Sequence, residues 1–378
     1  MSRSLPSLAK LSPPRLPKII ERVRLYKDLD RAREKPIVWI TAPPGMGKTT
    51  LAASYLKARK LKTLWYQVDE GDADPATFFH YLRLACQKFS PRHKTPLPHL
   101  TPEYLPGISI FTCRFFEQLY QRMKTPAILV LDNYHLLKQA DLIHDLIKVG
   151  LDIIPEGNQV LVLSRQPPPP PFARFLATQI IHIIQEDTLR LTTQEINGLI
   201  ALKQGKTEKG LPRKMAQDLY PQTRGWITGA ILMLEHGTSP ASTPDGTAAM
   251  PEVIFNYLAQ EVMKILPLET QEVLLQTAFA PSFTTSLSEA LTHNPGAPSI
   301  IEDLFRRRYF IEQRGEPPFT YQFHPLFQLF LQSLARTNLT SHALHELQQR
   351  TARLLGQHDK TEEAITLFLQ TKSWGEAE

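Results

Sequence analysis

The sequence predicts an α/β fold with a parallel five-stranded sheet in its first half, and a mostly helical second half. Up to residue 190, five short apolar runs alternate with segments whose apolar residues have helical spacing. Beyond residue 190 the helical spacing continues, and one pair of short strands interrupts it. The five runs expected to be strands are residues 36–41, 62–69, 127–132, 159–165 and 180–184.

The segment after the first run, Ala42–Thr50, reads APPGMGKTT and leads into an expected helix. Strand, glycine loop and helix in this order form a phosphate-binding loop, in which backbone N–H groups and the helix N-terminus surround an anion. Lys48 would reach the β and γ phosphates of a nucleotide, and the Thr49 hydroxyl would ligate Mg²⁺. The loop residues expected to contact the nucleotide are Pro44, Gly45, Met46, Gly47, Lys48, Thr49 and Thr50.

Ala42 stands at the first position of this motif, where glycine is usual. Alanine can adopt the conformation of a strand end, so we expect the site to form. The alternative is a chance Gly-Lys-Thr sequence on a surface turn, and the correct order of strand, loop and helix disfavours it. The first half is therefore predicted to be a P-loop NTPase domain that binds ATP or ADP.

The third run, AILVLD, ends in Asp132 and is followed by Asn133. A carboxylate at the end of a buried parallel strand is typical of a Walker B site, which holds Mg²⁺ directly or through water. The alternative is a strand followed by an ordinary aspartate turn. Many ATPases have a second carboxylate at the position of Asn133, and asparagine cannot act as a base. We therefore expect slow ATP hydrolysis, used as a switch, or catalysis that depends on another residue.

Two arginines complete the predicted site. Arg165 follows the fourth run and could reach a γ phosphate as a sensor, or it could be a surface arginine. The segment 16–33, which contains Arg22, precedes the first strand and could cover the adenine ring. The residues expected to act in catalysis are Lys48, Asp132 and Arg165.

Composition limits the class of protein. The chain has 378 residues with 42% hydrophobic and 21% charged residues, which indicates a packed protein of several domains. It has neither an apolar run of membrane-spanning length nor a secretory signal, so we expect a cytoplasmic protein without a membrane partner. Cys86 and Cys113 cannot form a disulfide framework, and Cys113 is expected to be buried.

Residues 1–35 hold ten Lys/Arg and four Asp/Glu, which accounts for the net charge of +6. Such an arm could contact nucleic acid. A solvated leader, partly ordered over residues 1–15, is favoured because no aromatic residues are interleaved for base stacking.

The second half begins with a predicted capping box, Thr192 with Glu195, and Trp226 is expected to pack between domains. Residues 237–250 are expected to form a linker. Helices at 253–266, 270–280 and 300–308, followed by a hairpin of 309–312 and 319–323, form a winged-helix pattern. Arg306, Arg307 and Arg308 could bind DNA, but an internal scaffold role is favoured, because this region is not strongly basic.

The predicted domains are 1–190 (nucleotide binding), 191–245 (helical lid), 246–338 (winged helix) and 339–378 (the first helices of a repeat array). The last helices have no closing cap, so we expect the array to continue beyond residue 378.

Several motifs occur together in the order seen in MalT-like signal-transduction ATPases, the STAND class, and its LuxR/MalT-type transcriptional regulators. These are the loop 42–50, VDEGD at 68–72, LVLDNYH at 129–135, LSR at 163–165, RGW at 224–226 and FHPLF at 323–327. The chain resembles this family over residues 15–378. The resemblance implies an ATPase domain, a helical lid, a winged helix and the start of a TPR-like superhelix.

The resemblance also implies a mechanism. ADP is held in a closed resting state, and His324 contacts its β phosphate. An effector sensed by downstream repeats opens the module, ATP replaces ADP, and the protein self-associates. Transcription is regulated through DNA binding by a domain outside these residues. The alternatives are a nucleic-acid-stimulated ATPase, which Asn133 disfavours, and a nucleotide-free scaffold with a vestigial loop, which intact Lys48, Thr49 and Asp132 disfavour.

Overall fold

The computed structural model of the chain describes residues 9–93, 95–137, 140–204, 213–236, 251–307, 309–358 and 360–370. The chain divides into two compact units, Met1–Arg190 and Leu191–Glu378. Among the helices of the described residues, none is both long enough and apolar enough to cross a membrane. The expected linker, residues 237–250, lies outside the described residues, and the subdivision of the second unit stays a prediction.

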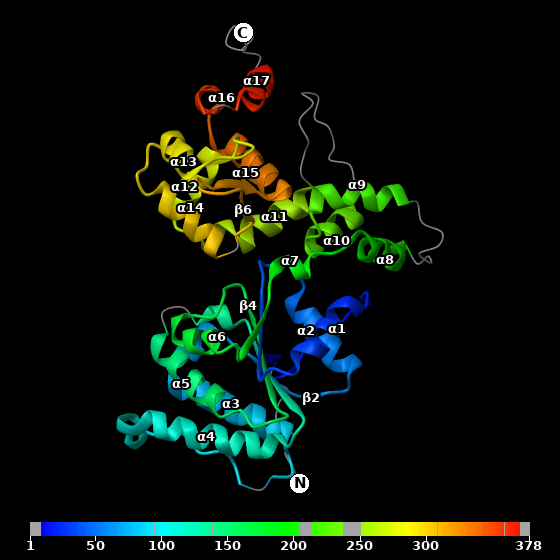
Figure 1. Cartoon of the computed structure of the whole chain (residues 1–378), viewed down its shortest axis with the longest axis vertical. Helices are drawn as coiled ribbons and strands as arrows, with labels where there is room; N and C mark the ends of the chain where they lie inside the picture. Colours follow the sequence, from blue (N-terminus) through cyan, green and yellow to red (C-terminus); the bar gives the residue numbers. More distant parts are fainter. Residues whose placement is uncertain are drawn as a thin grey trace. The chain divides into compact units, whose positions relative to one another are not determined.

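The first unit contains the predicted five-stranded parallel sheet (Figure 1). Its strands are β1 (Ile37–Thr41), β2 (Lys62–Gln67), β3 (Ala127–Asp132), β4 (Gln159–Ser164) and β5 (Ile181–Ile184). The strand order is β2-β3-β4-β1-β5, so β1 pairs with β4 on one side and β5 on the other. Because parallel strands end at the same edge of a sheet, the segments that follow β1, β3, β4 and β5 meet at one edge.

Helices cover both faces of this sheet (Figure 1). The flanking helices are α1 (Val23–Ala32) and α2 (Lys48–Ala58) on one face and α3 (Pro75–Phe89), α4 (Ile108–Met123), α5 (Asp141–Asp152) and α6 (Ala173–Ala177) on the other. Burial on both faces explains why the strands are continuous apolar runs: Ile37 and Trp39 of β1 join the core under α3–α6, and the alternate residues Val38 and Ile40 are also buried.

Two proline-containing segments of the first unit form short 3-10 helices, Pro102–Gly107 before α4 and Pro170–Phe172 after β4. The structure corrects one expectation for the cysteines. Cys86 is buried as a free thiol, but Cys113 is partly exposed. Cys113 lies on α4 between the buried Thr112 and the exposed Arg114, at the border of the stripe that packs on the core.

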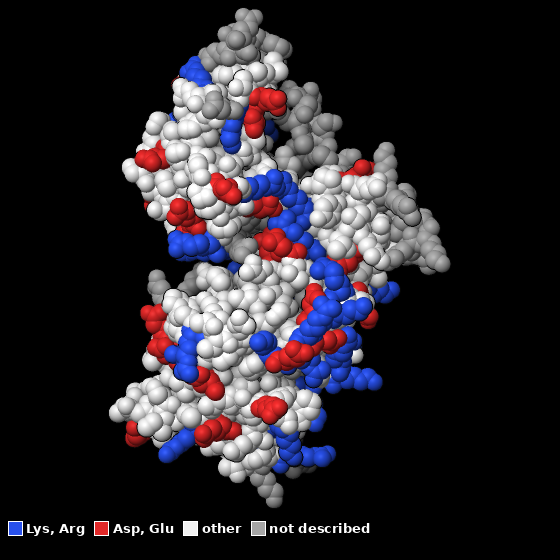
Figure 2. Space-filling view, viewed as in Figure 1, with Lys and Arg blue, Asp and Glu red and all other residues white. Residues whose placement is uncertain are grey.

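The first described residues of the basic leader are anchored to the first unit. A 3-10 turn, Ala9–Leu11, docks against β2 and α3. Lys10 Nζ donates to Asp69 Oδ2 at 2.6 Å and to Asp72 Oδ1 at 2.8 Å, and Leu11 is buried in the core. On the rest of the basic segment, Arg31 lies 3.6 Å from Asp28 and Arg59 pairs with Asp30. Over the face of the chain drawn in Figure 2, Lys and Arg side chains are interspersed with Asp and Glu. This mixture fits a solvated face better than a nucleic-acid surface.

The second unit is mostly helical (Figure 1). Its elements are α8 (Thr193–Gln204), α9 (Arg213–Thr223), α10 (Ile227–His236), α11 (Glu252–Glu261), α12 (Leu268–Thr277), α13 (Thr285–Thr292), α14 (Ala297–Arg306), β6 (Ile311–Arg314), β7 (Thr320–Phe323), α15 (Pro325–Asn338), α16 (Ser341–Gln357) and α17 (Thr361–Gln370). The antiparallel hairpin β6–β7 is present, and Phe283 adds a bridge to Tyr321.

Local signals in this unit mostly predicted the structure. The capping box forms, because Thr192 N donates to Glu195 Oε2 at 2.9 Å and Glu195 N to Thr192 Oγ1 at 3.2 Å. The helix expected at 253–266 ends earlier, at Glu261, and continues as the 3-10 turn Met263–Ile265. Arg307 pairs with Asp303 at 2.7 Å, and Arg308 lies outside the described residues.

Candidate nucleotide-binding site

The loop between β1 and α2 has the backbone that a phosphate-binding loop requires. Gly45 and Gly47 have φ values of +76° and +74°, a region that other residues rarely adopt. Gly47 is the N-cap of α2, so the first N–H groups of that helix face the loop. Ala42 is buried and its N–H donates to the Ser164 carbonyl at 3.3 Å, as a continuation of the β1–β4 ladder. Alanine in place of the usual first glycine therefore fits this strand end.

The side chain of Lys48 folds over the loop. Its Nζ donates to the carbonyl oxygens of Ala42 at 2.6 Å and Pro43 at 2.9 Å. The pKa of Lys48 is lowered to about 7, first by burial and then by the positive charge of Arg165. The carboxylates of Asp132 and Glu186 oppose this shift. A polyphosphate in the loop would add negative charge where two cations, Lys48 and Arg165, repel one another.

The two predicted Mg²⁺ ligands lie in direct contact. Thr49 Oγ1 donates to Asp132 Oδ1 at 3.0 Å, although the residues are 83 positions apart. Asp132 is 3% exposed, and burial raises the pKa of its carboxyl, opposed by hydrogen bonds from the Thr49 hydroxyl and the Asn133 N–H. The described residues contain no group of three or more His, Cys, Asp or Glu side chains placed for a metal. One hydroxyl and one carboxylate fit Mg²⁺ that takes its other ligands from phosphates and water.

Asn133 occupies a special backbone position after β3. Its φ is +58°, in the left-handed region that asparagine tolerates, and its N–H donates to Asp132 Oδ1 at 2.9 Å. The next residue, Tyr134, is buried against Trp39, and its hydroxyl lies 2.8 Å from His144 Nδ1 on α5. This buried pair positions the turn that carries Asp132. No sequence pattern predicts the pair, because His144 is ten residues away on another element.

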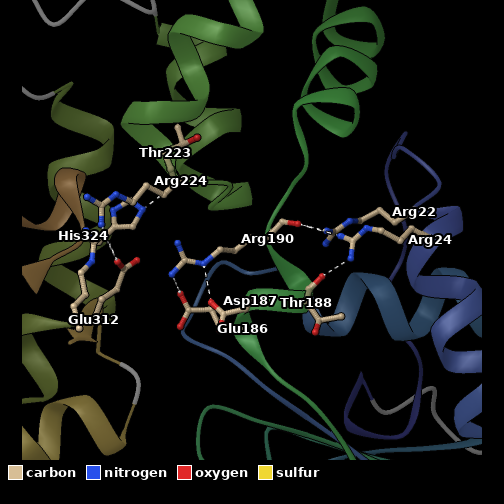
Figure 3. Close-up of polar contacts among 11 residues, drawn as sticks. Arg22, Arg24, Glu186, Asp187, Thr188, Arg190, Thr223, Arg224, Glu312 and His324 are labelled. Carbon is tan, nitrogen blue, oxygen red and sulfur yellow. Dashed lines mark hydrogen bonds and ion pairs between the residues drawn. The ribbon is translucent and has the colours of Figure 1, made fainter. Parts of the chain in front are cut away.

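Arg22, the N-cap of α1, and Arg24 in its first turn hold the last turn of the first unit. This turn is α7, Glu186–Leu189, and it follows β5. Arg22 Nη2 donates to the Arg190 carbonyl at 2.9 Å, and Arg24 donates to the carbonyls of Thr188 and Arg190 at 2.9 and 3.2 Å (Figure 3). Arg22 is buried at the N-cap of α1. Its observed partner is thus backbone, and contact with an adenine ring stays a prediction.

His324 lies in the second unit at the start of α15. It is 4% exposed, and its Nε2 lies 2.8 Å from the Thr223 carbonyl (Figure 3). Trp226 packs with its ring 6.0 Å from His324, and the adjacent Arg224 pairs with Glu312 of β6 at 2.9 Å. Trp226 is therefore a packing residue between helices and the hairpin of this unit. The contact of His324 with a phosphate stays a prediction.

The structure brings together Lys48, Thr49, Asp132 and Arg165 at the carboxyl ends of β1, β3 and β4. The other predicted loop residues line the same turn: Met46 is buried, Gly45 and Gly47 are partly exposed, and Thr50 is exposed on the first turn of α2. Sequence reasoning missed Glu186 and Arg24. The position of Glu186 just after the fifth strand could have indicated it, since that strand was predicted.

Comparisons with known proteins agree with these features. The family model described as the MalT winged helix domain matches residues 259–343. The HTH-type transcriptional regulator MalT of Vibrio campbellii is 28% identical over 342 residues, which are 88% of this chain and 37% of the relative. The chain thus spans little more than a third of the length of this relative.

Solved structures resemble the fold. A Walker-type ATPase of Pyrococcus abyssi matches with a TM-score of 0.53 and 14% identity, over 83% of this chain and 96% of that one. A STAND protein with a tetratricopeptide repeat sensor from Pyrococcus horikoshii matches with a TM-score of 0.44 and 20% identity, over 97% of this chain and 50% of that one.

The chain therefore has the expected fold of a P-loop ATPase and a winged helix of the MalT type, and over most of its length it is similar to MalT-type transcriptional regulators.

Proposed function

We propose that this chain is the nucleotide-gated switch module of a transcriptional regulator. In the resting state it holds ADP with Mg²⁺ in the first unit. ATP and an effector then favour an open form that self-associates, and the effector binds repeats that follow these residues. Hydrolysis of ATP is slow and resets the switch. The protein acts in the cytoplasm, and DNA binding belongs to a domain outside these residues.

The observation that carries this proposal is the convergence of Lys48, Thr49 and Asp132. Binding of a Mg²⁺–nucleotide requires a phosphate-binding backbone, a lysine and a pair of Mg²⁺ ligands. The chain has all three, and the hydroxyl and carboxylate of the ligand pair lie 3.0 Å apart. The MalT relatives support the regulatory role. The single carboxylate followed by Asn133 supports slow turnover, because the side chain of Asn133 cannot take a proton from water.

The test is to purify the chain without added nucleotide, denature it and identify what is released by chromatography. We expect close to one ADP per chain. A preparation that releases no nucleotide, and that binds neither ADP nor ATP in calorimetry with Mg²⁺, would refute the proposal and leave a scaffold role. Fast ATP hydrolysis stimulated by DNA would instead favour a nucleic-acid motor.

A further inference from the structure

The short turn α7 brings a carboxylate to the phosphate-binding loop. In the β1–β5 pair, Ile184 lies beside Ile40, and Glu186 and Ala42 each follow two residues later. The Ala42 carbonyl is also the acceptor of the Lys48 amine. Glu186 is therefore placed next to the position that Lys48 occupies, and its negative charge acts on Lys48.

Glu186 is held by an arginine of its own turn. Arg190 Nη2 lies 2.9 Å from Glu186 Oε1, and both side chains are mostly buried, with 20% and 16% of their surfaces exposed. Asp187 lies 3.4 Å from Arg190 Nε, but its side chain is 79% exposed. In Figure 3 the Arg190 guanidinium lies toward both carboxylates. Of the two, Glu186 is the charge that water screens less.

The backbone of the turn is fixed from the other side. Arg22 and Arg24 donate to the Arg190 carbonyl, and Arg24 also donates to the Thr188 carbonyl. Leu189 is fully buried beneath the turn. Because the backbone is tied down at these points, Glu186 cannot leave the neighbourhood of the loop without breaking several contacts.

We propose that Glu186 determines nucleotide specificity by disfavouring the third phosphate of ATP, and that Arg190 sets the strength of this effect. This inference rests on the proposed nucleotide binding and extends it. ATP carries one more negative charge than ADP, and that charge lies at the end of the phosphate chain nearest Lys48. A fixed carboxylate beside Lys48 repels the additional charge, and the Arg190 guanidinium partly neutralises the carboxylate.

The size of the effect follows from Coulomb's law. A unit charge added roughly 10 Å from a carboxylate, at an effective dielectric constant between about 20 and 80, changes a binding constant about 2- to 15-fold. We expect about fivefold, because Arg190 neutralises part of the carboxylate charge. The effect should shrink as salt is added, since the turn is near the surface.

The experiment measures the ratio of the dissociation constants for a non-hydrolysable ATP analogue and for ADP. It uses calorimetry on the full chain with Mg²⁺, at about 50 and 500 mM salt. Glu186→Gln keeps the shape and removes the charge, so the ATP-to-ADP ratio should fall about fivefold at low salt. Arg190→Met leaves the carboxylate unneutralised, so the ratio should rise. Asp187→Asn is the matched control, and it should leave the ratio within about twofold of the original.

The outcomes separate the inference from the function it rests on. If the unaltered chain binds neither nucleotide, the proposed function fails. If Glu186→Gln binds ADP normally and the ratio does not change, or if Asp187→Asn lowers the ratio equally, the inference is wrong. Should Glu186→Gln fail to fold, Arg190→Met decides: an unchanged or lower ratio in that variant also overturns the inference.

Discussion

The anchored leader makes a quantitative prediction about stability. The carboxylate of Asp72 is 0% exposed and has three donors: Lys10 Nζ at 2.8 Å, the Tyr66 hydroxyl at 2.7 Å and the Asp69 N–H at 2.9 Å. Lys10 is the only one of these donors that carries a charge. Lys10→Met therefore leaves a buried carboxylate with two neutral donors. Breaking a buried ion pair from one side costs about 3–5 kcal/mol, and we expect the lower end, because Lys10 is 14% exposed and water can enter.

The stability of the double mutant distinguishes an unpaired buried charge from lost packing. If the charge is the cause, Asp72→Asn should raise the free energy of unfolding of the Lys10→Met variant. Asp72→Asn alone should cost about 1–2 kcal/mol, since it weakens hydrogen bonds and leaves Lys10 paired with the exposed Asp69. In the double mutant no charge remains buried. We therefore expect Asp72→Asn to restore about 1–3 kcal/mol to Lys10→Met, so that the double mutant is more stable than the lysine variant.

The assay is urea unfolding of the four proteins, with hydrogen exchange of the β2 amides as the local measure of the first unit. Lys88→Met is the control. Lys88 Nζ donates to the Leu11 carbonyl at 3.0 Å and to the Ser12 hydroxyl, so it docks the same segment without contacting Asp72. Asp72→Asn should not restore stability to that variant. Additive effects of Lys10→Met and Asp72→Asn would refute the reasoning.

Three predictions concern the nucleotide. Lys48→Ala should abolish tight binding of ADP and ATP in calorimetry, and binding within threefold of the original would contradict the assigned role. The pKa of Lys48 is lowered to about 7 here, and a phosphate would raise it toward its ordinary value, so binding should take up protons above pH 7 and weaken as pH rises. At pH 8 the uptake should be about 0.9 proton, measured by calorimetry in buffers of different ionisation heat, and Lys48→Arg should remove it. His324→Ala should loosen ADP and favour the open form, and an unchanged ADP affinity would rule out the contact of His324 with a phosphate.

The parts of the fold that sequence predicted best are those determined by local pattern. The strand β3 is a run of apolar residues closed by Asp132, and the glycines of the loop signal their positive φ in the sequence itself. The helix α13 was missed because it has only eight residues, although Thr284 caps it and the buried Leu287 and Leu291 lie one turn apart. The 3-10 turn 102–107 was hidden by its prolines.

Contacts between distant segments could not be predicted in the same way. The sequence predicts that Lys10 belongs to a solvated basic leader. In the structure Leu11 is buried, and this packing brings Lys10 into contact with the Asp72 carboxylate. In the sequence, Glu186 is one acidic residue after a predicted strand. It lies beside the phosphate-binding loop only because β5 pairs with β1 and not with β4. For both Lys10 and Glu186 the sequence shows the charge of the side chain, but only the folded structure shows which residue it contacts.

The geometry also limits which residues can bias a switch. A ligand shifts an equilibrium only through its differential affinity for two states, and moving from 1:99 to 99:1 requires about 5.5 kcal/mol. Lys48 and Thr49 belong to a loop fixed between β1 and α2, so they contact phosphate equally in any arrangement of the two units. They supply affinity without favouring the closed or the open form. A bias toward one form must come from groups that the two forms place differently around the nucleotide, and His324 of the second unit is predicted to be such a group. Variants of Lys48 should therefore weaken nucleotide binding in both forms, whereas His324→Ala should change the balance between the closed and the open form. Variants of Glu186 and Arg190 should change the ratio of the ADP and ATP affinities.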